Sequence, residues 1–105
     1  MSRLDEVKAA LLTCTNRVYH FFAAKADPPY ITWSESGRPG FHAGDRREEY
    51  SDTGTVHLFT RNECDLLVGK IEAALDEHGI GCELEAVQCE SDTGLFHYTW
   101  SWEAG

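Results

Sequence analysis

The sequence predicts an α+β fold, a mainly antiparallel sheet of four to five strands with two helices packed on one face and a C-terminal aromatic β-hairpin. Two stretches carry apolar residues at helical spacing, and the end of the chain alternates apolar and polar residues on both sides of a turn. With 105 residues, 42% of them hydrophobic, the chain can form one modest core. We therefore expect a single domain over residues 1–105.

The N-terminal third predicts one helix and two strands. A helix is expected over residues 2–13, where apolar side chains recur at helical intervals: Leu4, Val7 and Leu11. Two runs rich in β-branched and aromatic residues, 18–22 and 30–34, predict strands. Pro28 and Pro29 between them exclude a regular helix.

The middle of the chain predicts a loop, a strand and a second helix. Residues 35–45 contain three glycines and a proline, which favours a long surface loop, and residues 55–60 alternate as a strand does. Thr60 and Glu63 have the spacing of a capping box. A helix is therefore expected over residues 62–78, ended by Gly79 in a left-handed conformation. Its apolar positions are Cys64, Leu67, Val68, Ile71, Ala74 and Leu75.

The C-terminal segment, "CELEAVQCESDTGLFHYTWSWE", predicts a long β-hairpin, because two alternating runs flank a short turn. Four aromatic residues of its second strand share one face: Phe96, Tyr98, Trp100 and Trp102. A ladder of this kind can be a core wall or a ligand platform, and we expect core packing against the helices.

The triplet Asp-Thr-Gly occurs twice, in "SDTGTVH" and "SDTGLFH", and it is the triplet around the catalytic carboxylate of aspartic proteases. Such a protease needs two carboxylates that share one proton, each in a loop after a buried apolar strand. Here polar residues precede both triplets, and one helix separates them. We therefore interpret both triplets as turns, with His57 and His97 as neighbours on adjacent strands.

Charge and composition exclude several classes of function. The formal net charge of −9 opposes specific binding to nucleic acid and to anionic membrane surfaces. No apolar run has the roughly 20 residues that cross a bilayer, and the N-terminus lacks the pattern of a signal peptide, so we expect no membrane association and an intracellular product. The cysteines Cys14, Cys64, Cys82 and Cys89 are then more consistent with reduced thiols than with disulfides.

The sequence contains no set of residues typical of an enzyme. The histidines and cysteines have no metal-binding spacing, and no nucleophile and base form a recognisable pair, so we expect no catalytic, cofactor-binding or metal-binding residues. Cys64 near a helix start could be a reactive thiol, but the apolar spacing of that helix favours a buried one.

Three segments together resemble the small tail-completion proteins of long-tailed bacteriophages and prophages, also described as minor tail proteins or tail terminators. They are "NRVYHFFAAKADPPYITWSESG", "GTVHLFTRNECDLLVGKIEAALDEHGI" and "LEAVQCESDTGLFHYTWSWE". In that family a run like "PPYIVW" follows an early "VYH", the T-x-x-E helix ends at a glycine, and a "TGLxHY-x-W" strand closes the chain. The resemblance covers almost the whole length.

The resemblance implies an α+β structural protein without catalysis or cofactors. Such proteins form a homo-oligomeric ring on the end of the tail tube, halt its polymerisation and allow the head to attach. The implied partners are other copies of the chain, the tail tube protein and head-tail connector proteins. The implied location is the virion tail, after assembly in the host cytoplasm.

The long loop supplies a candidate interface. A ring protein needs adaptable surfaces for its neighbours, and arginine and aromatic residues are enriched at the centres of protein contacts. The candidate residues in or beside this loop are Arg38, Phe41, Arg46 and Arg47. An ordinary solvated loop is the alternative.

A different class of function also fits the acidity. An inhibitor of the DNA-mimic type presents carboxylates in place of phosphates and binds a basic partner. Its acidic residues would be expected at phosphate-like intervals, whereas basic residues interrupt them here. We therefore keep the acidic inhibitor as the alternative to the tail-completion protein.

Overall fold

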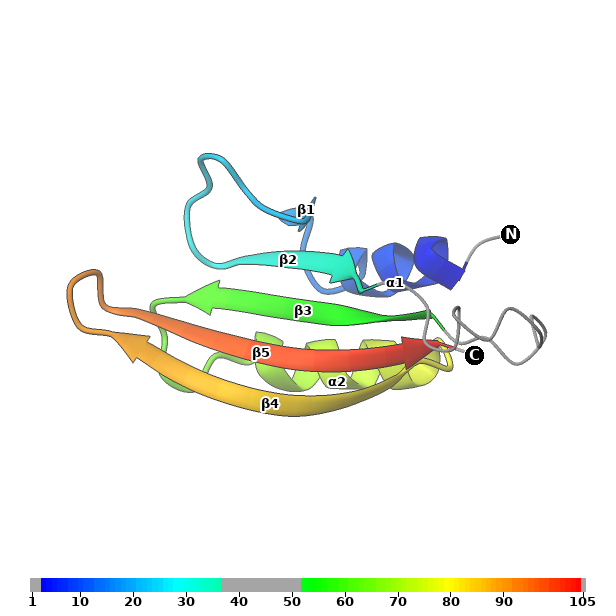
Figure 1. Ribbon diagram of the computed structural model, residues 1–105. Helices are drawn as coiled ribbons and strands as arrows, with labels where there is room; N and C mark the ends of the chain where they lie inside the picture. The colour runs from blue at the N-terminus through cyan, green and yellow to red at the C-terminus, as the bar shows by residue number, and fades with distance from the viewer. Residues whose placement is uncertain (1–2, 37–51, 105) are drawn as a thin grey trace.

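The protein forms two layers, a five-stranded sheet and a pair of helices (Figure 1). The computed structural model describes residues 3–36 and 52–104. The elements follow the order α1 (Arg3–Leu12), β1 (Val18–His20), β2 (Tyr30–Glu35), β3 (Asp52–Thr60), α2 (Leu67–Glu77), β4 (Gly81–Glu90) and β5 (Leu95–Ala104). The predicted α+β class and the size of the sheet are confirmed.

The sheet has the strand order β1-β2-β3-β5-β4 and is antiparallel except where β1 pairs with β2 in parallel. Both helices lie on the same face, α1 against β1 and β2 and α2 against β4, and the helices also contact each other (Figure 1). The opposite face has no helix over it among the described residues. We call it the open face.

The core lies between the helices and the sheet. Tyr98, Trp100 and Trp102 of β5 point into it and are almost fully buried, while Phe96 is partly buried. The helices contribute the other apolar wall, with Val7, Ala10, Leu11, Leu67, Ile71, Ala74 and Leu75. The aromatic ladder of the hairpin is therefore a core wall, as predicted.

Strand β1 ends two residues earlier than its sequence predicts. Phe21 has φ = 73°, a conformation that a bulky residue rarely adopts and that turns the chain out of the strand. The side chains of Phe21 and Phe22 are consequently exposed, although the N–H of Phe21 still donates to the Trp33 carbonyl of β2 at 2.7 Å.

Helix α2 begins five residues later than predicted, and the proposed capping box is wrong. The Thr60 hydroxyl donates to Oδ2 of Asp65 and accepts from the N–H of Asn62. Oδ1 of Asp65 then accepts from the N–H of Leu67, the first helical residue, at 2.9 Å. Because Asp65 satisfies the helix start, Glu63 takes no part in it.

The predicted end of α2 is confirmed. Gly79 has φ = 74°, and its N–H donates to the Asp76 carbonyl at 3.0 Å. The N–H of Ile80 donates to the Leu75 carbonyl at 2.9 Å. This pair of bonds satisfies the last helical carbonyls and returns Ile80 to the core.

The two Asp-Thr-Gly triplets have different structures. Residues 91–94 form the hairpin turn, with Gly94 at φ = 71°, as predicted. The first triplet lies inside β3, so the turn predicted there is wrong and the strand begins at Asp52. Gly54 is needed because it pairs with Trp102, and a Cβ on Gly54 would lie 2.5 Å from Cζ2 of that indole.

Candidate interaction surface

The open face is built from the residues that alternate with the core positions of each strand. In β3 and β5, His57, Phe59, His97 and Thr99 point to this face, since the residues between them are buried against the helices. All four are half-buried, although neither of the described helices covers them. The same alternation that predicts the core also places these side chains together.

Four rings form a continuous aromatic row across four adjacent strands of the open face. Tyr19 of β1 meets Tyr30 of β2 edge to face at 6.2 Å between ring centroids. Tyr30 stacks on Phe59 of β3 at 4.9 Å, and Phe59 stacks on His97 of β5 at 4.3 Å. The stacked rings shield one another's faces, so their edges form an apolar ridge toward solvent.

His57 and His97 are hydrogen-bonded neighbours beside this row, which confirms the predicted cross-strand contact. Nδ1 of His57 lies 2.8 Å from Nε2 of His97, and the Thr99 hydroxyl lies within 3.4 Å of both rings. Burial lowers the pKa of both imidazoles below the ordinary 6.5, and the charge of Glu90 partly opposes this at His97. The pair is therefore neutral at pH 7.

Exposed aromatic residues extend the row toward the β1 edge. Phe21 and Phe22 are 57% and 74% exposed, and with Ala23 they flank a hollow of about 230 Å³. Tyr30, Thr32 and Phe59 form its floor on the open face. Apolar side chains left in water in this way are typical of a contact surface.

Carboxylates lie along β4, and the nearest described arginines stand just outside the strands: Arg17 precedes β1, and Arg61 follows β3 and donates to the Thr93 carbonyl at 2.9 Å. The five strands contain no lysine or arginine. Glu83 and Glu90 of β4 pair with open-face positions of β5. Burial raises the pKa of the Tyr30 hydroxyl, and the charge of Glu90 raises it further. Glu85, at the irregularity in β4, accepts a hydrogen bond from Ser101 at 2.8 Å. The surface is thus apolar in the middle and anionic along β4.

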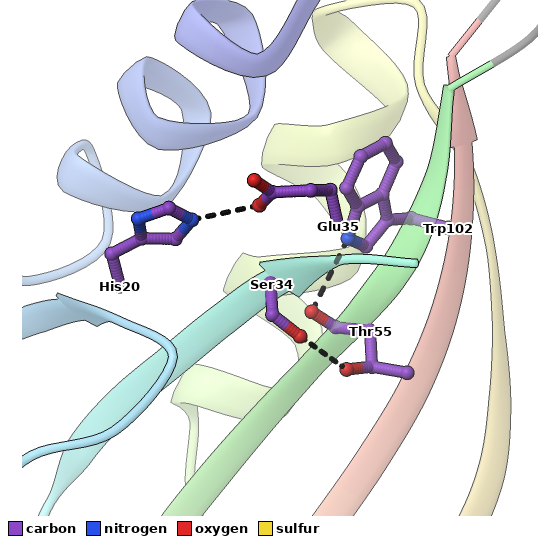
Figure 2. Close-up of polar contacts among 5 residues, drawn as sticks. All are labelled: His20, Ser34, Glu35, Thr55 and Trp102. Carbon is purple, nitrogen blue, oxygen red and sulfur yellow. Dashed lines mark hydrogen bonds and ion pairs between the residues drawn. The ribbon is translucent and has the colours of Figure 1, made fainter. Parts of the chain in front are cut away.

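Polar contacts join the central strands β2, β3 and β5 at the end of the sheet away from the aromatic row (Figure 2). The hydroxyls of Ser34 and Thr55 are 3.2 Å apart, and the indole N–H of Trp102 donates to the Thr55 carbonyl at 3.2 Å. On the helix side, Nε2 of His20 lies 2.7 Å from Oε1 of Glu35, and this hydrogen bond holds the pKa of Glu35 below its ordinary 4.5. These contacts stabilise the register of the strands.

The aspartates of the two Asp-Thr-Gly triplets are too far apart within one chain to form a protease dyad with each other. Asp52 pairs with Ala104 at one end of β5, whereas Asp92 lies in the turn before the other end. A ten-residue strand is about 30 Å long at roughly 3.3 Å per residue. Two carboxylates that far apart cannot share a proton.

The thiols and possible metal ligands are dispersed. Cys64 is exposed and precedes α2, so the buried thiol predicted inside a helix is wrong. Within residues 3–36 and 52–104, no three histidine, cysteine or acidic side chains gather as a metal site would require. No described helix is long and apolar enough to cross a membrane.

The four candidate interface residues from the sequence, Arg38, Phe41, Arg46 and Arg47, lie outside the described residues. Their predicted role stays a prediction. The aromatic row was not among the sequence candidates, although Phe59 and His97 could have been found from the polar side of the two alternating strands.

Compared with known proteins, the chain matches no family model and no curated protein at a significant level of similarity.

Proposed function

We propose that this chain is a structural protein that completes the tail tube of a bacteriophage or prophage and helps to join tail to head, as a homo-oligomeric ring. The observation that supports the proposal best is the open face. In the part of the chain that the structure describes, helices cover only one side of the sheet and leave an aromatic row on the other, which is suited to contact with neighbouring proteins.

A ring requires two different surfaces on each copy, because contacts repeat head to tail around it. The sheet supplies such surfaces at its two edges, β1 and β4, in addition to the open face. The predicted interface residues 38–47 would add arginine and aromatic contacts to this set. The tail tube protein and the head-tail connector proteins are the further partners that this role requires.

The charge of the chain is compatible with a position around a DNA path. With a net charge of −9, a lumen lined by acidic residues does not hold the phosphates that pass through it. The role needs no cofactor and no chemical step.

The proposal is tested first by the mass of the protein in solution and then by its effect on the elongation of tail tubes. Light scattering after size exclusion, across protein concentrations, should give a discrete multiple of the 11.8 kDa chain, seen as closed rings in negative stain. If the protein is a monomer alone, purified tail tubes should assemble it at their ends and stop elongating. Tubes whose length distribution is unchanged by an excess of the protein would contradict the proposal.

The absence of basic residues from the five strands favours a second candidate, an acidic inhibitor that binds a basic partner. It predicts a stable one-to-one complex with a nucleic-acid-binding protein and no effect on tail tubes. A pull-down that recovers only tail proteins would remove this candidate.

A further inference from the structure

We propose that the open face binds a basic segment of a partner protein, whose aliphatic stems lie across the aromatic row and whose cationic heads pair with the carboxylates of β4. The inference rests on the proposed function only for the existence of a protein partner. It names the chemistry that this partner must present.

The dimensions of the open face fit long basic side chains. Neighbouring strands lie about 4.8 Å apart, and Glu90 pairs with Leu95 of β5, so its carboxylate is one strand away from His97 and two from Phe59. Arginine and lysine bury their methylene stems on apolar surface while their charged heads reach polar groups. A side chain lying over the ridge between Phe59 and His97 can therefore extend its head to Glu90.

Charge complementarity favours a basic partner over the other candidates. The carboxylates of Glu83 and Glu90 belong to the outermost strand, and both residues are exposed. His57 and His97 add no positive charge near neutral pH, because burial keeps both rings neutral. A nucleic acid would bring its phosphates against these carboxylates and be repelled.

A second copy of the chain is also disfavoured on this face. The five strands hold no lysine or arginine, so two open faces packed with β4 over β4 would oppose carboxylates with carboxylates and gain no charge pair between strands. The irregularity in β4 between Leu84 and Ala86, with glutamates on both sides, also discourages pairing of two β4 edges. The open face is thus left for a partner of opposite charge.

The experiment follows binding by NMR. The probe is a short peptide in which arginine and valine alternate, and its control replaces each arginine by citrulline, which keeps the shape and removes the charge. Addition of the arginine peptide should shift the ring signals of Tyr30, Phe59 and His97. The citrulline peptide should bind at least about tenfold more weakly, because each lost charge pair on a partly desolvated surface removes favourable energy.

Two charge-reversal variants distinguish binding at the open face from general electrostatic attraction between the peptide and the acidic protein. The double variant Glu83→Lys/Glu90→Lys should weaken binding of the arginine peptide at least about tenfold. The control Asp76→Lys/Glu77→Lys changes the net charge equally at exposed positions of α2 and should bind within about twofold of the wild type. Circular dichroism verifies that both variants stay folded.

Three outcomes would overturn the inference. The two double variants could lose the same affinity for the arginine peptide, the citrulline peptide could bind as tightly as the arginine peptide, or the shifted NMR signals could lie outside the aromatic row. The same shifts on addition of a single-stranded oligonucleotide would assign the face to nucleic acid. Concentration-dependent broadening of open-face signals without peptide would assign it to a second copy. If the peptide binds but the protein has no effect on tail tubes, only the proposed function is contradicted. If the protein caps tubes but does not bind the peptide, only this inference is contradicted.

Discussion

The indole nitrogen of Trp100 donates a hydrogen bond to Oε2 of Glu72, with 2.8 Å between the two atoms. Trp100 is fully buried in the centre of β5, and Glu72 lies on the exposed side of α2. The bond satisfies the only polar atom of this buried side chain, since an indole has a single donor. It also fixes α2 over the aromatic wall of the sheet.

Glu72→Ala should destabilise the protein by about 1 to 3 kcal/mol, because it leaves the buried N–H of Trp100 without an acceptor. Chemical denaturation of both proteins measures the difference. The control is Glu77→Ala, at another exposed position of the same helix, which should stay within about 0.5 kcal/mol of the wild type. In a Trp100→Phe background, which has no N–H, Glu72→Ala should cost much less, and an unchanged cost would disprove the role of the bond.

Trp100→Ala should cost about 3 to 5 kcal/mol, because it removes a fully buried ring and leaves a large cavity. The free energy of unfolding, measured by denaturation in urea, tests this value. A loss below about 1 kcal/mol would show that the ring contributes little to the core. The paired control is Val87→Ala, at a half-exposed apolar position of β4 that faces Tyr98, and its cost should be far smaller.

The sequence predicts the fold well where one periodicity dominates. The hairpin and α1 follow simple alternation and helical spacing, and Gly79 marks the end of α2 because its conformation requires glycine. The predicted start of α2 is wrong because the sequence offers two possible capping residues there. Thr60 and Glu63 have the right spacing, but Asp65 is the residue that captures both the Thr60 hydroxyl and the first helical N–H.

Other features depend on contacts between distant segments. Gly54 resembles a turn residue in the sequence, and only its pairing with Trp102 explains why a glycine stands inside a strand. The aromatic row depends on strand order, since Tyr30, Phe59 and His97 meet only because β3 lies between β2 and β5. The contact of Glu72 with Trp100 likewise joins residues 28 positions apart in the sequence.

Gly54→Ala should destabilise the protein by about 3 kcal/mol, because the added Cβ would overlap the indole of Trp102 and the backbone of the neighbouring strand β2. Thermal and urea denaturation measure the loss. The matched control is Gly69→Ala, within helix α2, where an added Cβ meets nothing within 4 Å. That change should stabilise the protein by up to about 1 kcal/mol, because alanine favours a helix more than glycine does. Equal effects of the two substitutions would refute the close approach at Gly54.

Acidification should destabilise the protein through His57 and His97. The pKa of each ring is lower in the folded chain than the ordinary 6.5, so the unfolded chain binds protons first as the pH falls. Stability should therefore decrease from pH 7.5 toward pH 5.5 and level off once the folded rings are also protonated. The lowered pKa values of Glu35 and Asp65 act in a separate window, below their ordinary values of 4.5 and 3.8.

Urea denaturation at several pH values, for the wild type and for His57→Gln/His97→Gln, isolates the contribution of the two rings. The variant should lose most of the slope between pH 7.5 and 5.5, because neither glutamine can take up a proton in that range. The single variants should each retain part of the slope, since the remaining ring is still partly buried. A double variant with the full wild-type slope would show that groups other than the two half-buried imidazoles cause the acid sensitivity.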